Sequence, residues 1–203
     1  RQRATAADGA AASRPNAESE TVSGDLDDPE AAAFAAREAL GAGNLLLAYD
    51  IAATALARAP DHPALHYQQV LALARLGELD RAKDLYDRHL GEDDSLDARA
   101  LRARLIKDAA WRAAGDTQAR LIAEASAAYE EVFARTQDPF PAINAASLAL
   151  FAGDRHRATA LARQVLAAIG TAPPRDYYAA ATAAEANLLL GRNEEAERLI
   201  ETA

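Results

Sequence analysis

The stretch GNLLLAYDIAATALARAP (residues 43–60) decides the fold of this chain. It opens with Gly43, places Ala48 five residues later, Ala55 seven after that and Pro60 five beyond. Gly just past the end of a helix can take the left-handed conformation that closes the helix, and Ala side chains let neighbouring helices approach closely. The stretch therefore predicts a turn followed by the second helix of a helical hairpin.

The same turn recurs along the chain. Glycines follow one another at intervals of 34, 38, 38 and 38 residues, at Gly43, Gly77, Gly115, Gly153 and Gly191. Ala stands five residues after four of them, whereas the third unit has Ala119 and a longer apolar stretch over residues 120–136. Because self-similarity at such a period is typical of repeat proteins, the sequence predicts an all-α fold, an α-solenoid of about five antiparallel helix pairs.

The ends of this domain follow from local signals. Residues 1–27 mix Ala, Ser, Gly, Pro and acidic residues without apolar periodicity, a composition that predicts a disordered arm or linker. Asp28-Pro29-Glu30 then supplies a helix cap, a first-turn proline and an acidic first turn. We therefore expect the repeat domain to cover residues 28–203.

Composition excludes several classes of function. The net charge of −9 argues against non-specific binding to nucleic acid, and no apolar stretch approaches the length of a membrane span. Absence of Cys excludes disulfides and Cys-ligated metals and fits a reducing compartment, so a cytoplasmic location is expected.

The spacing of Gly43, Ala48, Ala55 and Pro60 resembles the tetratricopeptide repeat. Later units keep the first two of these four positions. A narrower resemblance, over residues 127–165, is to the TRAF-binding helical-repeat region of animal stress-activated kinase kinases and its bacterial counterparts. It is carried by Tyr129, Phe133, Pro139, Ile143, Asn144, Ala145 and Gly153. This resemblance implies a regulatory scaffold joined to effector domains such as kinases or nucleotide cyclases.

No catalytic constellation is found in the sequence. There is no Cys, and no Ser lies in a nucleophile elbow. His62 and His66 have the spacing of two zinc ligands on a helix, but Pro63 places His62 before the helix and no Glu follows it. We therefore expect no catalytic residue, no metal and no cofactor, and a divergent helical enzyme is the least favoured alternative.

The most basic stretch of this acidic chain precedes the third turn glycine. Its cations are Arg99, Arg102, Arg104, Lys107 and Arg112. They can form surface pairs with nearby acidic residues such as Asp94, Asp97 and Asp108, or they can face a ligand that carries carboxylates. Trp111, the single Trp, is predicted to pack in the core because its indole fills volume among many alanines.

The resemblance implies that the first helix of each pair lines a concave binding groove. Counting back from the turn glycines selects the residues expected to line it, which are Tyr67, Gln68, Arg102, Ile143, Asn144 and Tyr178. One cation, amides and apolar groups suit an extended acidic or amphipathic segment. The expected function is a protein-interaction or regulatory scaffold module of a signalling protein, with its groove filled in cis or in trans. The alternative is a structural spacer or self-association module, and the oligomeric state stays open.

Overall fold

The computed structural model describes residues 27–170 and 177–201. Across these ranges the chain forms ten helices and no strand, as the sequence predicted. In chain order the helices are α2 (Pro29–Gly41), α3 (Leu45–Leu56), α4 (Pro63–Leu76), α5 (Leu79–His89), α6 (Leu96–Arg112), α7 (Gly115–Thr136), α8 (Pro139–Phe151), α9 (Arg155–Ile169), α10 (Tyr177–Leu189) and α11 (Asn193–Glu201). The arm predicted over residues 1–27 lies, apart from its last residue, outside the described residues.

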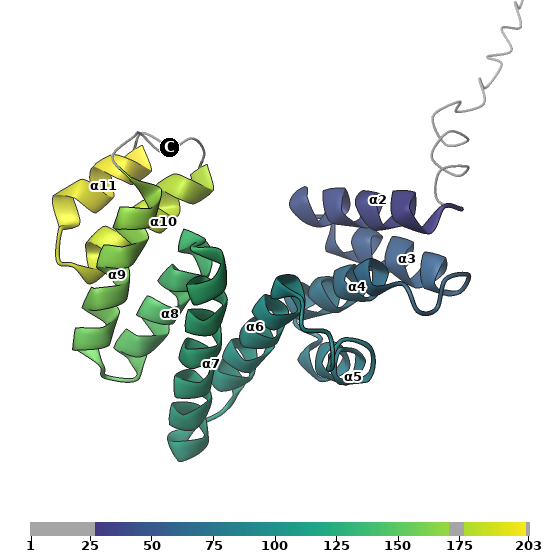
Figure 1. Ribbon diagram of the computed structural model, residues 1–203, viewed down its shortest axis with the longest axis horizontal. Coiled ribbons are helices and arrows are strands. Elements are labelled where there is room, and N and C mark those ends of the chain that lie inside the picture. The colour runs from purple at the N-terminus through teal and green to yellow at the C-terminus, as the bar shows by residue number, and fades with distance from the viewer. Residues whose placement is uncertain (1–26, 171–176, 202–203) are drawn as a thin grey trace, which may run out of the picture.

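Consecutive helices form five hairpins, α2/α3, α4/α5, α6/α7, α8/α9 and α10/α11, which stack into a bent row. First helices lie side by side as α2 on α4, α4 on α6 and α8 on α10, and in Figure 1 the long α7 stands between α6 and α8 at the middle of the row. The α-solenoid predicted from the glycine period is confirmed. We call the surface formed by α2, α4, α6, α8 and α10 the inner face.

The first helix begins where the sequence predicted. Asp28 is the N-cap of α2, and its carboxylate accepts hydrogen bonds from the N–H groups of Glu30 and Ala31. Pro29 occupies the first turn, where its missing N–H leaves no helical bond unmade. At α4, His62 is the N-cap and Pro63 the first residue, so His62 precedes the helix as expected.

Four of the five turns share one backbone hydrogen bond. In each, the residue after the glycine donates its N–H to the carbonyl five residues earlier: Asn44 to Ala39, Glu78 to Leu73, Asp154 to Ala149 and Arg192 to Asn187, at 2.8–2.9 Å. The intervening glycine has positive φ, 85° at Gly77, which a residue without Cβ adopts at no steric cost. This bond closes the first helix and aims the second one back along it.

The third turn is built differently. Ala113 and Ala114 are extended, and Gly115 is the first residue of α7 instead of the residue that ends α6. The two helices are also longer than the rest, with 17 residues in α6 and 22 in α7, against 9 to 15 in the other helices described. The long second helix predicted for this unit is therefore confirmed, but Gly115 does not occupy the position of the other four glycines.

Alanine dominates the core along the described part of the chain. Ala48, Ala82, Ala158 and Ala196, the alanines five residues after a turn glycine, are all buried. Larger buried side chains such as Leu65, Leu73 and Leu161 fill the space between helix layers. Second helices thus lie close to their neighbours because only a methyl group separates the backbones.

Helix α6 belongs to two separate parts of the core. Leu101 and Leu105 pack with the apolar residues of α4 and α5, whereas Ala103 and Ala110 pack with those of α7, α8 and α9. The stacking is uneven here: α3 packs broadly on α4 and α7 on α8, but α5 makes little contact with α6. The junction between the second and third pairs is therefore the loosest of the stack.

Candidate functional site

A hollow of about 690 Å³ opens on the inner face between α2, α4 and the start of α6. Tyr67 and Gln68, both predicted to line the groove, lie in its wall. Arg37 and Arg75 provide cations, and Arg75 donates to the carbonyl of Leu40 at 2.6 Å, which joins α4 to the end of α2. Two of the residues selected from the sequence therefore lie at this hollow.

Tyr67 connects this hollow to α6. Burial raises the pKa of its phenol, the charge of Asp97 raises that pKa further, and the charge of Arg104 opposes the rise. Tyr129 of α7, beneath the same region, has its pKa raised by burial, and the charge of Arg104 again opposes the rise. The Arg104 guanidinium therefore lies within electrostatic range of both phenols, which stay protonated at neutral pH.

Arg104 is a half-buried cation without a hydrogen-bond acceptor among the described residues. Its Nε lies 3.4 Å from an Asp108 carboxylate oxygen, but this buried Nε–H makes no hydrogen bond. Arg104 and Asp108 are four residues apart on α6 and share a face. The Arg104 side chain remains 33% exposed beside Asp108, and an Arg guanidinium can bind a carboxylate with two parallel hydrogen bonds.

Lys107 and Asn144 bridge α6 and α8. The Lys107 ammonium donates to the Asn144 side-chain oxygen at 2.7 Å and lies 5.5 Å from the centre of the Tyr129 ring. Burial, assisted by the charge of Arg104, lowers the pKa of Lys107. The Asn144 amide nitrogen donates to the Phe140 carbonyl at 2.9 Å, so both ends of this amide are engaged.

One further bridge continues the line from α8 to α10, where the Ser147 hydroxyl donates to the Glu185 carboxylate. Polar side chains therefore run across the inner face from α4 to α10. We call this line the inner strip; it consists of Tyr67, Arg104, Lys107, Asp108, Asn144, Ser147 and Glu185.

An exposed aromatic pair lies beside the inner strip. Trp111 of α6 and Phe151 of α8 meet edge to face with their ring centres 5.0 Å apart, yet they remain 47% and 65% exposed. The prediction that Trp111 packs in the core is wrong. Trp111 shares the face of Arg104 and Asp108, and the neighbouring Ala110 takes the buried position instead.

The other predicted groove residues lie in different places. Ile143 is 2% exposed and packs in the core, out of reach of a ligand. Tyr178 is 77% exposed at the start of α10, with its ring against Tyr177. Arg102 lies with residues of α5 and α7 in a hollow on the other side of α6. The structure therefore brings Tyr67, Gln68 and Asn144 to the inner face, buries Ile143, places Arg102 on the other side of α6 and leaves Tyr178 exposed at the start of α10.

Arg102 was selected by counting back from Gly115, but this turn is not built like the others, because α6 ends at Arg112 and Gly115 opens α7. Arg102 and Arg104 are two residues apart, which separates them by about 200° around the helix axis, and Arg104 is the one that faces inward. The buried stripe of Ala98, Leu101 and Leu105 would have indicated this face from the sequence.

The basic residues of α6 do not all take the two roles considered for them. Arg99 pairs with Asp94 and Glu131, and Arg112 donates to the carbonyl of Gly77. Arg104 and Lys107 instead face inward. The Arg104 Nε–H makes no hydrogen bond, and the Lys107 ammonium donates to Asn144. Arg99 thus pairs with carboxylates, Arg112 binds a backbone carbonyl and two cations face inward, whereas Arg102 takes neither role and lies on the other side of α6.

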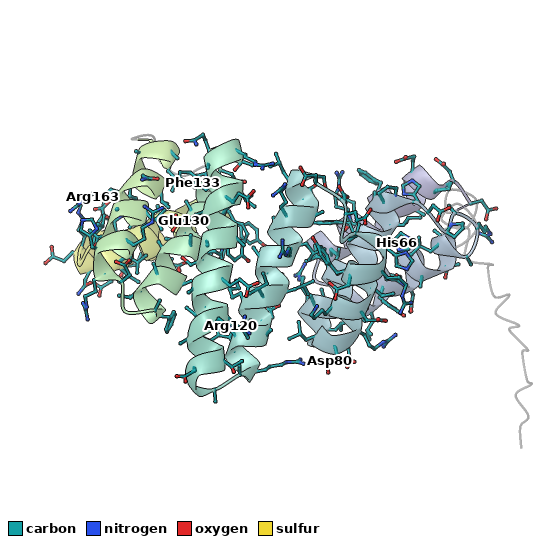
Figure 2. The ribbon with its side chains drawn as sticks, turned by 60° about the horizontal axis from the view of Figure 1, so that its bottom comes forward. His66, Asp80, Arg120, Glu130, Phe133 and Arg163 are labelled. Atoms are coloured by element: carbon teal, nitrogen blue, oxygen red, sulfur yellow. The ribbon has the colours of Figure 1, made fainter. Side chains whose placement is uncertain are left out.

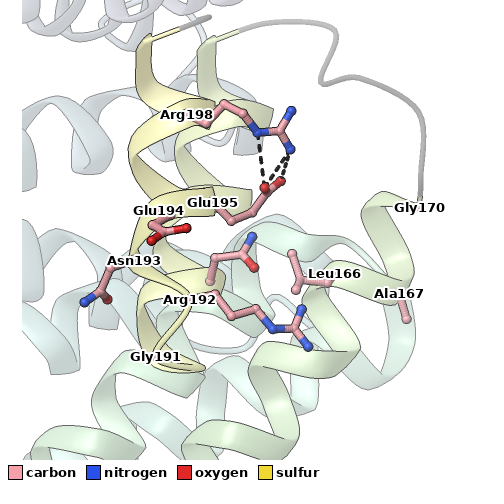
Figure 3. A pocket seen from close by; sticks show the side chains of 10 residues that line it. Leu166, Ala167, Gly170, Gly191, Arg192, Asn193, Glu194, Glu195 and Arg198 are labelled. Carbon is pink, nitrogen blue, oxygen red and sulfur yellow. Dashed lines mark hydrogen bonds and ion pairs between the residues drawn. The ribbon is translucent and has the colours of Figure 1, made fainter.

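A larger hollow, of about 1090 Å³, lies at the C-terminal end between α9, α10 and α11 (Figure 3). Its wall includes the ion pair of Glu195 and Arg198, 2.5 Å apart, drawn with dashed lines in the figure. The Arg198 hydrogen bond lowers the pKa of Glu195. This hollow shares no residue with the inner strip.

No group of three or more His, Cys, Asp or Glu residues in the described part of the chain is arranged to hold a metal ion. Among the helices of residues 27–170 and 177–201, none combines the length and apolar character needed to cross a membrane.

Solved structures show the same fold. The chain is similar to TTC0263, a thermophilic TPR protein of Thermus thermophilus, with a TM-score of 0.71 and 16% identity over 87% of this chain and 90% of that one. A tetratricopeptide repeat protein from Parabacteroides merdae gives a TM-score of 0.65 and 18% identity, covering 91% and 67%. YrrB, described as a TPR protein with an unusual peptide-binding site, gives 0.53 and 13%, covering 92% and 90%.

A comparison with curated protein sequences found no match. A family model, by contrast, matches residues 47–149, just over half of the 203 residues. Its description is Tetratricopeptide Repeats-Sensor, and the matched range runs from α3, the second helix of the first pair, into α8. With a stack of five helix pairs and a match of this extent, the chain belongs to the Tetratricopeptide Repeats-Sensor (TPR-S) family.

Proposed function

We propose that this domain is a regulatory interaction module of a larger signalling protein, and that it binds a peptide segment or a neighbouring domain along its inner face. Tetratricopeptide folds generally mediate protein–protein interaction. The observation that carries the proposal is Arg104, a half-buried guanidinium with unused donors in the middle of the inner strip. The resemblance to the TRAF-binding region of kinase kinases supports a signalling role, and the lack of Cys supports a cytoplasmic one.

The inner face also offers an apolar contact at a fixed distance from this cation. Arg104 and Trp111 share one face of α6 seven residues apart, which corresponds to about 10 Å along the helix axis. Exposed aromatic surface of this kind is typical of contact sites. A ligand that binds both therefore carries an acidic side chain and a large apolar side chain about 10 Å apart.

An extended peptide meets this requirement with few residues. In the polyproline II conformation, which has three residues per turn and a rise of about 3.1 Å per residue, side chains three positions apart lie on the same side of the peptide, about 9 Å apart. The remaining polar groups of the strip, such as Tyr67 and Ser147, suit the amides of such a backbone. The expected ligand is thus an extended segment with an acidic residue and an aromatic or large aliphatic residue three positions away.

Selection of peptides from a random library on the 203-residue chain tests this proposal. We expect enrichment of peptides with an acidic residue and a large apolar residue three positions apart. Binding can be followed by the fluorescence of Trp111, the single Trp. Arg104→Gln should weaken the selected peptides roughly tenfold or more, because a hydrogen bond to a charged group contributes about 1.5–3 kcal/mol. Phe151→Ala should weaken them as well.

Arg102→Gln is the matched control, since Arg102 lies on the same helix two residues away but faces the other side. Its affinity for the selected peptides should equal that of the parent chain. If peptides bind equally well to the Arg104→Gln and parent proteins, the inner face is not their site. If no peptide is enriched, the interaction proposal fails altogether.

A spacer or self-association module is the second candidate. It is favoured by Leu46 and Leu47, which are exposed at the start of α3 beside a shallow hollow. Sedimentation of the chain with and without the substitution Leu46→Asp separates the two. A dimer that Leu46→Asp dissociates, together with an inner face that selects no peptide, would make this second candidate the better account.

A further inference from the structure

A second hollow lies on the opposite side of α6 from the inner strip. It has a volume of about 310 Å³ and is bounded by α5, α6 and α7. Figure 2 labels Arg120, one of its lining residues, near the lower end of α7. We call this the back hollow; because it shares no residue with the inner strip, its role is independent of the proposed function.

The back hollow exists because one helix junction is incompletely packed. In the first and third junctions the second helix lies broadly on the next first helix, as α3 does on α4, but α5 makes little contact with α6. The space that α5 would otherwise fill leaves the side of α6 uncovered between α5 and α7. Uncovered helix surface in an otherwise closely packed stack is a place where a ligand can replace missing contacts.

The floor of the back hollow is apolar. It is formed by Leu105, Ile106 and Ala109 of α6 and by Leu121 of α7. Tyr86 of α5 closes one side, and its hydroxyl is already used, since it donates to the carbonyl of Ala98 at 3.0 Å. The floor therefore offers contact to an apolar group and no hydrogen-bond partner of its own.

The rim carries more positive than negative charge, in contrast to the chain as a whole. Lys83 is paired with Asp87 at 2.6 Å, and Arg120 with Glu124 at 3.2 Å, each pair one turn apart on its own helix. Arg102 is the third cation and has no hydrogen bond or ion pair with any described residue. Three cations and two carboxylates leave one positive charge, located at Arg102, beside an apolar floor in a protein of net charge −9.

We infer that the back hollow binds a small amphipathic carboxylate, with the carboxylate on Arg102 and the apolar body over Leu105, Ile106 and Leu121. Arg presents two parallel donors that match a carboxylate. The volume lies at the lower end of the range for small-molecule sites, of the order of 300–1,000 Å³, so the apolar body is a short acyl chain or a single aromatic ring. An apolar site with one convergent charged group is the usual form of such sites.

Calorimetric titration of the 203-residue chain with octanoate, octanol and octylammonium tests the inference at low ionic strength, where exposed charges are least screened. Octanoate should bind with one saturable site, and octanol and octylammonium at least tenfold more weakly. Equal binding of octanol and octanoate would overturn the inference, and so would the absence of saturable octanoate binding.

Variants then locate the site. Arg102→Gln should weaken octanoate at least tenfold, whereas Arg104→Gln, two residues along the same helix on the inner face, should leave it unchanged. Arg102→Glu should reverse the preference in favour of octylammonium. Ala109→Leu narrows the hollow and should reduce octanoate binding in a chain whose helical circular dichroism matches the parent. Equal effects of Arg102→Gln and Arg104→Gln would contradict the assignment, and they would leave the peptide proposal to be judged on its own experiment.

Discussion

Single alanines determine how closely the helices of this stack approach. Ala82 is fully buried and Ala158 is 2% exposed, both five residues after a turn glycine. Leu at either position would push two backbones apart, so we expect Ala82→Leu and Ala158→Leu to lower the free energy of unfolding by about 1–3 kcal/mol each. Urea denaturation followed by circular dichroism measures this.

Ala42 is the control for both substitutions, because it is exposed at the end of α2. Ala42→Leu should change the free energy of unfolding by no more than about 0.5 kcal/mol, as is usual for surface positions. If all three variants lose equal stability, the alanines are not the points of closest approach.

A pair of histidines makes stability depend on pH. The rings of His66 and His89 stack in parallel, with centres 3.9 Å apart. The Pro60 carbonyl accepts a hydrogen bond from the His66 Nε2–H at 2.6 Å, and the His66 Nδ1 is buried without a hydrogen-bond partner among the described residues. Burial, followed by the charges of His66 and Arg88, lowers the pKa of His89, while Asp61 and Asp84 oppose that change.

The sign of the effect follows from this lowered pKa. Between the pKa of folded His89 and about 6.5, its value in an unfolded chain, the unfolded chain binds more protons. Titration of His89 therefore leaves the free energy of unfolding unchanged well above about pH 6.5 and lowers it as the pH falls from there through the folded pKa. His89→Phe keeps a stacked ring without titrating, so its free energy of unfolding should fall less than that of the parent between about pH 7 and pH 5. His156→Phe, at an exposed position of α9, is the control and should follow the parent. A His89→Phe curve parallel to the parent would contradict the assignment.

At the scale of helices, the sequence predicted the elements well because each carries its own signals. Gly77, for example, ends α4 in the left-handed conformation, and the bond from Glu78 to Leu73 closes the turn locally. The cap at Asp28 and the long α7 were likewise predictable from neighbouring residues. Such features depend on contacts within one turn of chain, and the sequence contains all of them.

The inner face was predicted less well because it depends on rotation about the helix axis. Arg102 and Arg104 are two residues apart on α6 and so lie about 200° apart around its axis, and Arg104, not Arg102, lies at the inner face. No local signal at Gly115 distinguishes a glycine that ends one helix from a glycine that begins the next. Bridges such as that of Lys107 to Asn144 join residues 37 positions apart, and these positions are brought together only by stacking.

The molecule as a whole is divided at the junction of α5 and α6. Little packing connects these helices, and α6 contributes Leu105 to one core cluster and Ala103 to the other. Since each pair in a solenoid is stabilised mainly by its neighbours, we expect α2–α5 to open independently of α7–α9. Native-state hydrogen exchange in increasing urea should show two groups of amides, with α2–α5 exchanging first.

A matched pair of substitutions tests this division. Leu105→Ala and Leu161→Ala remove the same atoms from the two clusters, and such changes cost about 2–5 kcal/mol. Leu105→Ala should accelerate exchange in α4 and α5 and leave α9 unchanged, and Leu161→Ala should do the reverse. Uniform acceleration of all helices by both variants would show that the stack unfolds as one unit.

The alanine core also has a thermal consequence. Unfolding raises the heat capacity by about 0.45 cal/K/mol for each Å² of apolar surface that is newly exposed to water. A buried Ala such as Ala52 or Ala145 releases one methyl group, far less surface than a Leu or a Phe. The heat capacity of unfolding should therefore fall below the usual ~12–15 cal/mol/K per residue, which flattens the stability curve. A molecule built in this way loses little stability in the cold and approaches its melting temperature gradually.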